Sequence, residues 1–205
     1  MNYNIITAGV GGQGLMLLSN VIGQACAEMH LNIKTAETHG LAQRSGSIST
    51  HVRIGEQVLS PLIPYGEADV MVSMEAIETL RNCEYISDGG MIIINKYIWH
   101  PVQSTFTRVK SRGKTPYITF DEIHERLLTI TPHVRVIDCL ALANKAGNPL
   151  TTNTVLLGAL AHIEGFPIPM ETLKQVLPRA VPKTTLDSNL LALQLGYDDV
   201  ESLIE

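Results

Sequence analysis

The residues with the clearest potential for chemistry lie in the segment YNIITAGVGGQG, residues 3–14. Gly9, Gly11 and Gly14 match the G-x-G-x-x-G spacing of a dinucleotide-binding turn between a strand and a helix. Glycines let the backbone turn tightly and approach a ligand, and the first amides of the following helix attract an anion. The segment therefore predicts an anion site at Gly9, Gly11, Gly12, Gln13 and Gly14; a tight turn that binds nothing is the alternative.

A second polar segment, ETHGLAQRSGS at residues 37–47, has groups that suit a phosphate or a carboxylate. The guanidinium of Arg44 could clamp such an anion, and His39 could donate a hydrogen bond into the same cleft. An ion pair for Arg44 and a loop-fixing role for His39 are the structural alternatives. Glu37 lies near the position of the ribose-binding acidic residue of NAD-binding folds. The candidate binding residues of this segment are His39, Gln43, Arg44, Ser45, Gly46 and Ser47.

The order of four motifs resembles one enzyme family. GVGGQG at 9–14, ETHGLAQRSGS at 37–47, HVRIG at 51–55 and SP at 60–61 resemble the small subunits of indolepyruvate:ferredoxin oxidoreductases. More broadly, they resemble the gamma-type domain of the 2-oxoacid:ferredoxin oxidoreductases. The histidine in the second segment points to the arylpyruvate branch, with the pyruvate, 2-oxoisovalerate and 2-oxoglutarate enzymes as alternatives. The likeness continues through Gly66–Asp69, Glu75 with Arg81, Gly90–Asn95, Asn189 and Leu195–Tyr197, and so covers nearly the whole chain.

The resemblance implies a chain that completes an enzyme and supplies no catalytic residue of its own. In that family the large (alpha) subunit carries thiamine diphosphate, Mg²⁺ and 4Fe–4S clusters. The complex converts an arylpyruvate, CoA and oxidised ferredoxin into an arylacetyl-CoA, CO₂ and reduced ferredoxin. The implied partners are the large subunit and, through it, ferredoxin; an isolated chain can also pair as a homodimer. CoA is the candidate ligand of the glycine loop, and packing of the loop on the large subunit is the alternative.

Composition narrows the classes of function. The 15 Lys and Arg against 20 Asp and Glu give a net charge of −5, which argues against nucleic acid and anionic membranes as partners. No apolar run approaches the ~20 residues of a membrane span. Cys26, Cys83 and Cys139 are too far apart for an iron–sulfur or zinc site and are expected to be reduced thiols in the cytoplasm. A free-standing NAD(P)-binding oxidoreductase and a purely structural subunit remain as alternatives.

Hydrophobic patterning predicts a single α/β domain over residues 1–205, with a Rossmann-like, mostly parallel sheet, flanking helices and a helical C-terminal extension. The segment 47–54 alternates as a strand with one face less buried, and 58–62 is expected to return beside it as a hairpin. The other expected strands are at 5–8, 32–36, 68–74, 91–95, 117–120 and 134–137. The expected helices are at 15–29, 73–81, 139–146, 154–163, 170–177 and 188–195, with Thr152 or Asn153 capping the fourth.

Overall fold

The computed structural model describes residues 2–40, 46–100, 109–110 and 117–201. These residues form one six-stranded sheet of order β2-β3-β1-β4-β5-β6, with helices on both faces. The predicted α/β fold is confirmed. The strands are β1 (Tyr3–Val10), β2 (Ile33–His39), β3 (Ser47–Ile54), β4 (Ala68–Ser73), β5 (Ile86–Asn95) and β6 (Val134–Ile137).

Parallel pairing predominates, but one antiparallel strand is inserted. The pairs β1–β4, β4–β5 and β5–β6 are parallel, whereas β3 is antiparallel to both β1 and β2. As a result β2 runs in the same direction as β1 but is separated from it by β3. The first crossover of the chain therefore leads to a strand two places away, and not to the neighbouring strand.

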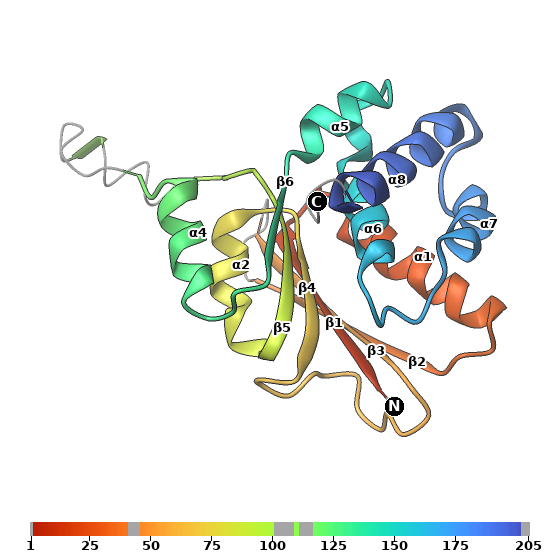
Figure 1. The fold of residues 1–205 in the computed structure, drawn as a ribbon, viewed down its shortest axis with the longest axis horizontal. Coiled ribbons are helices and arrows are strands. Elements are labelled where there is room, and N and C mark those ends of the chain that lie inside the picture. Colours follow the sequence, from red (N-terminus) through yellow and green to blue (C-terminus); the bar gives the residue numbers. More distant parts are fainter. Residues whose placement is uncertain (1, 41–45, 101–108, 111–116, 202–205) are drawn as a thin grey trace.

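The helices cover the two faces of the sheet unequally (Figure 1). The first helix, α1, packs on one face and the second, α2, on the other, in two separate hydrophobic clusters. Because these helices follow the adjacent parallel strands β1 and β4, a crevice is expected outside the carboxyl ends of those strands. With α1 (Leu15–Glu28) lie α5 (Cys139–Lys145), α6 (Thr152–His162), α7 (Met170–Ala180) and α8 (Leu186–Glu201), whereas α4 (Phe120–Leu128) lies with α2 (Ala76–Asn82).

Contacts from outside the sheet explain why one sequence expectation for β3 was wrong. Ser49 and His51, on the face predicted to be less buried, are only 7% and 1% exposed. Ile63 donates its backbone N–H to Nδ1 of His51 at 3.2 Å, which satisfies this buried ring. Burial, and secondarily the charge of Arg53, lowers the pKa of His51. The alternation identified a strand but could not show that Ile63 of the following loop and Tyr85 cover the face that carries His51.

Other local expectations also differ from the structure. Residues 58–62 form a loop and not a hairpin strand, because β2 occupies the place beside β3. Residues 117–119 are irregular and Phe120 begins α4, whose N-terminus is closed by a capping box between Thr119 and Glu122. The T-x-x-E spacing of that box was a readable helix signal. The helix α6 begins at Thr152 with Thr151 as its N-cap residue, so the predicted caps were misplaced by one or two residues.

The helical C-terminal part is confirmed, and glycine makes its closest packing possible. A Cβ on Gly158 would overlap the backbone carbonyl of Leu193, and one on Gly196 would overlap that of Val155. The backbones of α6 and α8 can therefore approach only because both positions lack a side chain. Within the described part of the chain, no helix is both long enough and apolar enough to cross a membrane.

Candidate functional site

The glycine loop joins β1 to α1 at the carboxyl end of the sheet. Gly9 lies inside β1, so it is part of the strand and not of the turn that the motif predicted. Left-handed backbone occurs at Gly12, with φ of 96°, and at Gly14, with φ of 80°, whereas Gly11 is not in that region. Gly14 is also the N-cap residue of α1. The conformational requirement for glycine therefore falls on the later half of the motif.

Hydrogen bonds inside the loop decide which of its groups remain available to a ligand. Val10 donates its N–H to Oε1 of Gln13 at 2.8 Å, and Gly11 donates its N–H to the carbonyl of Gly46 at 2.9 Å. The Gln13 N–H returns to the Val10 carbonyl at 3.3 Å. Gly11 therefore cannot offer its amide to an anion. The backbone amides without a partner among the described residues are those of Gly12, Gly14, Leu15 and Met16.

Leu15 and Met16 were missed as candidate groups because their side chains are apolar. Their backbone amides matter because the first N–H groups of a helix have no carbonyl one turn earlier to bond with. The α1 N-terminus also has no side-chain cap in the structure. These open donors and the positive end of the helix dipole suit an anion.

A cavity of about 290 Å³, here called the charged cavity, adjoins these amides and is lined by the carboxylate of Glu37 and the imidazole of His39. Glu37 and His39, at the end of β2, lie 3.3 Å apart between Oε1 and Nε2. The two groups are close but not hydrogen-bonded. The Oε1 atom of Glu37 is buried and has no hydrogen-bond partner among the described residues. The structure thus brings His39 next to the glycine loop. The cavity is lined by Val10, Gly12, Gly14, Leu15, Met16, Glu37, His39 and Ile48.

The same geometry argues against a ribose-binding role for Glu37 and against a metal site shared by His39 and His51. A dinucleotide fold places its ribose-binding acidic residue on the strand adjacent to β1, but Glu37 is on β2, beyond the inserted β3. His39 pairs in register with Ile48, so His51, three residues further along β3, lies on the other face of the sheet. The residues described by the structure contain no group of three His, Cys, Asp or Glu side chains that could hold a metal.

The second sequence motif connects β2 to β3 and meets the glycine loop at its base. Gly40 donates its N–H to the Ser47 carbonyl at 2.8 Å, and the Gly46 carbonyl accepts from Gly11. The Ser47 hydroxyl donates to a carboxylate oxygen of Glu78, so it is not free to donate to a ligand. Gln43, Arg44 and Ser45 lie outside the described residues. The two motifs that the sequence separated by more than twenty residues are therefore adjacent at Gly11 and Gly46.

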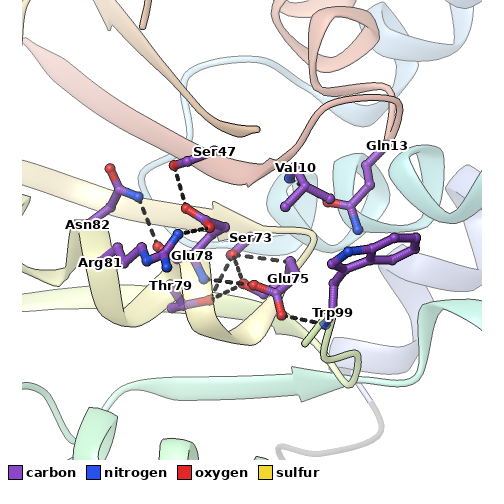
Figure 2. A network of polar contacts seen from close by, with 10 residues as sticks. All are labelled: Val10, Gln13, Ser47, Ser73, Glu75, Glu78, Thr79, Arg81, Asn82 and Trp99. Carbon is purple, nitrogen blue, oxygen red and sulfur yellow. Dashed lines mark hydrogen bonds and ion pairs between the residues drawn. The ribbon is translucent and has the colours of Figure 1, made fainter. Parts of the chain in front are cut away.

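Two buried glutamates of α2 lie beneath this junction (Figure 2). Glu78 accepts from Ser47 and, at 2.7 Å, from the guanidinium of Arg81. Glu75 is the N-cap residue of α2 and accepts from the Glu78 N–H at 2.8 Å and the Trp99 N–H at 2.7 Å. Desolvation by burial raises the pKa of Glu75, against the lowering effect of these amides. Sequence reasoning paired Arg81 with Glu75, whereas the structure pairs it with Glu78.

A second cavity, of about 230 Å³, lies on the other side of the glycine loop. Gly12 borders both cavities, and the second is otherwise mainly apolar. Its outer rim includes Leu150, which is 82% exposed. A cavity of about 320 Å³ at the opposite end of the sheet is lined by Ile54 and Gly55 of the HVRIG motif but by no residue of GVGGQG or ETHGLAQRSGS, so we place the candidate site at the glycine loop. The second cavity is lined by Gly12, Gln13, Met74, Asn95, Tyr97, Leu140, Pro149, Leu150 and Thr152.

Comparison with known proteins gives consistent matches along the chain. The sequence profile of the pyruvate ferredoxin/flavodoxin oxidoreductase family matches residues 4–199. A protein of Thermococcus kodakarensis, "Indolepyruvate oxidoreductase subunit IorB", is 37% identical over 98% of both chains. The protein of that name from Archaeoglobus fulgidus is 38% identical over 98% of this chain and 97% of its own. A "2-oxoglutarate synthase subunit KorC" of Methanocaldococcus jannaschii is 25% identical over 99% of this chain and 96% of its own.

A solved structure shows the same fold. It is described as 2-oxoglutarate:ferredoxin oxidoreductase from Magnetococcus marinus with 2-oxoglutarate, coenzyme A and succinyl-CoA bound. The TM-score is 0.71 at 22% identity, over 98% of this chain and 31% of that chain. The counterpart of this fold is therefore one portion of a longer polypeptide there.

Proposed function

The chain belongs to the pyruvate ferredoxin/flavodoxin oxidoreductase family, and from this premise we propose that it is the small subunit of an indolepyruvate (arylpyruvate):ferredoxin oxidoreductase. One observation carries the proposal: the relatives named as indolepyruvate oxidoreductase subunits match from end to end at clearly higher identity than the 2-oxoglutarate synthase subunit. The arylpyruvate branch is therefore favoured over the gamma subunits of other 2-oxoacid enzymes.

The proposed enzyme oxidatively decarboxylates an arylpyruvate, transfers the acyl group to CoA and reduces ferredoxin. Thiamine diphosphate and 4Fe–4S clusters in the large subunit supply the decarboxylation and the electron transfer. This chain contributes a binding surface, which fits its three free cysteines and its lack, among the described residues, of a cluster of metal-binding side chains. We also propose that residues 1–205 form one domain and that the complex works in the cytoplasm, which the reduced cysteines support.

The proposed role of the glycine loop is to hold a phosphate group of CoA. The open amides of Gly12, Gly14, Leu15 and Met16 are suitable donors, and the adjoining cavity is large enough for such a group. The side-chain NH₂ of Gln13 is a further donor on the side of the second cavity, because its Oε1 is occupied by Val10. His39 lies in the charged cavity and can donate to the phosphate as well. Arg44 is proposed to act as a second positive group from the neighbouring motif.

The substrate assignment is tested with the reconstituted complex. With the large subunit present, reduction of ferredoxin or a viologen is expected with indolepyruvate or phenylpyruvate, and only when CoA is added. Neither subunit alone should support it. The comparison is kcat/KM for indolepyruvate, phenylpyruvate, pyruvate, 2-oxoisovalerate and 2-oxoglutarate at equal concentrations. A higher value for pyruvate, 2-oxoisovalerate or 2-oxoglutarate would contradict the arylpyruvate assignment and leave the family assignment intact.

A further inference from the structure

Glu78 is a buried acidic residue for which neither the fold nor the proposed chemistry has so far given a purpose. Its side chain is only 4% exposed and its two oxygens are shared between Arg81, on its own helix, and Ser47, at the start of β3. A buried carboxylate is costly unless hydrogen bonds and an opposite charge compensate it. Arg81 provides the charge. Ser47 provides a contact to a segment more than thirty residues away in the sequence.

The contact to Ser47 leads directly to the glycine loop. The preceding residue, Gly46, accepts the N–H of Gly11 at 2.9 Å, and Ser47 itself accepts the N–H of Gly40 at 2.8 Å. Ser47 and Ile48 point to opposite faces of β3 because strand side chains alternate. Ile48 lines the charged cavity, whereas Ser47 reaches α2 on the other face (Figure 2). Glu78 therefore reaches the site only through the backbone of residues 46 and 47.

Glu78 lies in the first turn of α2, where the helix dipole favours an acid, but it is close to a second buried carboxylate. Glu75 is also buried and lies one helical turn earlier; burial is the main cause of its raised pKa, and the negative charge of Glu78 adds to it. Two buried carboxylates in one turn repel each other. A repulsion between buried carboxylates that the fold retains, with a partner on each Glu78 oxygen, is typical of a functional position.

We propose that Glu78 is a positioning residue: through Ser47 it fixes the start of β3, so that Gly46 holds Gly11 and the glycine loop keeps its open amides beside the charged cavity. Ser47, predicted from the sequence to bind the ligand, is then a support of the loop. The effect on ligand binding rests on the proposed function, but the effect on the loop does not.

Amide hydrogen exchange of the ¹⁵N-labelled full chain tests the effect on the loop. In Ser47→Ala and Glu78→Ala the Gly11 amide should exchange about tenfold faster, because its acceptor is no longer fixed. The control amide is Gly55, which donates to the Asn32 carbonyl at 2.9 Å at the other end of the sheet and should change less than ~twofold. Glu78→Gln should stay near the parent, because its amide can keep both contacts.

Ser87→Ala is the matched control variant, since it also removes one serine hydrogen bond, to the Ala68 carbonyl at 2.9 Å. It should leave Gly11 unchanged. Unchanged Gly11 exchange in Ser47→Ala would overturn the proposal. Equal acceleration of exchange at Gly11 and Gly55 would also overturn it, because that result indicates general destabilisation of the fold. Both outcomes can be read from Ser47→Ala even if Glu78→Ala does not fold.

Kinetics of the reconstituted complex give the functional consequence. Ser47→Ala should raise KM for CoA by roughly fivefold to tenfold while kcat changes less than ~twofold, since the loop is displaced but no reacting group is removed. Glu78→Gln should keep the parental KM. Faster Gly11 exchange with an unchanged KM for CoA supports the positioning role and contradicts the CoA role of the loop, so the two failures are distinguishable.

Discussion

Replacing Gly14 by alanine should destabilise the protein far more than the same change at Gly12, although both residues have left-handed backbone. A side chain in that conformation costs roughly 1–2 kcal/mol, which replacing a flexible glycine in the unfolded chain partly offsets by ~0.4–1 kcal/mol. At Gly12 nothing lies within 4 Å of a new Cβ, so that difference, about 1 kcal/mol, is the whole effect.

At Gly14 the new Cβ would overlap the side chain of Asn153, which is buried and donates to the Gly14 carbonyl at 3.2 Å. Displacing it adds an overpacking cost of ~1–3 kcal/mol and the loss of a hydrogen bond worth ~1 kcal/mol. The expected total for Gly14→Ala is therefore about 3–5 kcal/mol. For a chain of this length each kcal/mol lowers Tm by roughly 2–4 °C.

The assay is urea unfolding of the two variants, with the free energy of unfolding compared at unchanged m-value. Asn153→Ala supplies the decisive background, because it removes the obstructing side chain. In that background Gly14→Ala should cost only about 1 kcal/mol more, like Gly12→Ala. Equal losses for Gly12→Ala and Gly14→Ala in the parent chain, or an unchanged Gly14→Ala cost in the Asn153→Ala background, would refute the steric reasoning.

Three further predictions concern other parts of the molecule. Gly12→Val should lower turnover at limiting CoA while the complex stays assembled on gel filtration, and an unchanged KM for CoA would favour loop packing on the large subunit. Gly196→Ala should lower Tm markedly, because the new Cβ clashes with the backbone of Val155. Gly23→Ala is the control and should not lower it, because its Cβ meets nothing within 4 Å. Equal shifts in Tm would contradict the close packing of α6 against α8. Burial lowers the pKa of His51, so as the pH falls below 6.5 the unfolded chain takes up a proton there before the folded chain does, and the free energy of unfolding should fall. Urea titrations should show a smaller fall in His51→Gln. An identical fall in that variant would exclude His51 as the source.

Several features were predictable from sequence because their causes are local. The run of apolar residues ending at Val10, the glycines at 12 and 14, and the apolar stripe of α1 all depend on backbone sterics and on side chains within a few residues. The α/β fold follows from the same alternation of short apolar strands and helices. Thr119 with Glu122 was an equally local helix signal and was overlooked in favour of a strand.

The order of the strands depended on the whole chain. An alternating pattern such as that of β3 identifies a strand, but it does not specify a partner, because backbone hydrogen bonds are the same for every sequence. Only the assembled structure shows that β3 lies between β1 and β2, which moves Glu37 away from β1, and that Ile63 and Tyr85 cover His51. The sequence therefore suggested a ribose-type position for Glu37 that the sheet does not provide.

For the candidate site, too, some features followed from the sequence and others only from the tertiary structure. The residue types of the glycine loop and of ETHGLAQRSGS were by themselves enough to indicate an anion site and, by resemblance, a family. Which groups are free was decided by tertiary contacts: the Gly11 amide is taken by Gly46, and the Ser47 hydroxyl by Glu78. Each such contact joins residues more than thirty positions apart, and a hydrogen-bond donor serves a ligand only if the fold has not already given it a partner.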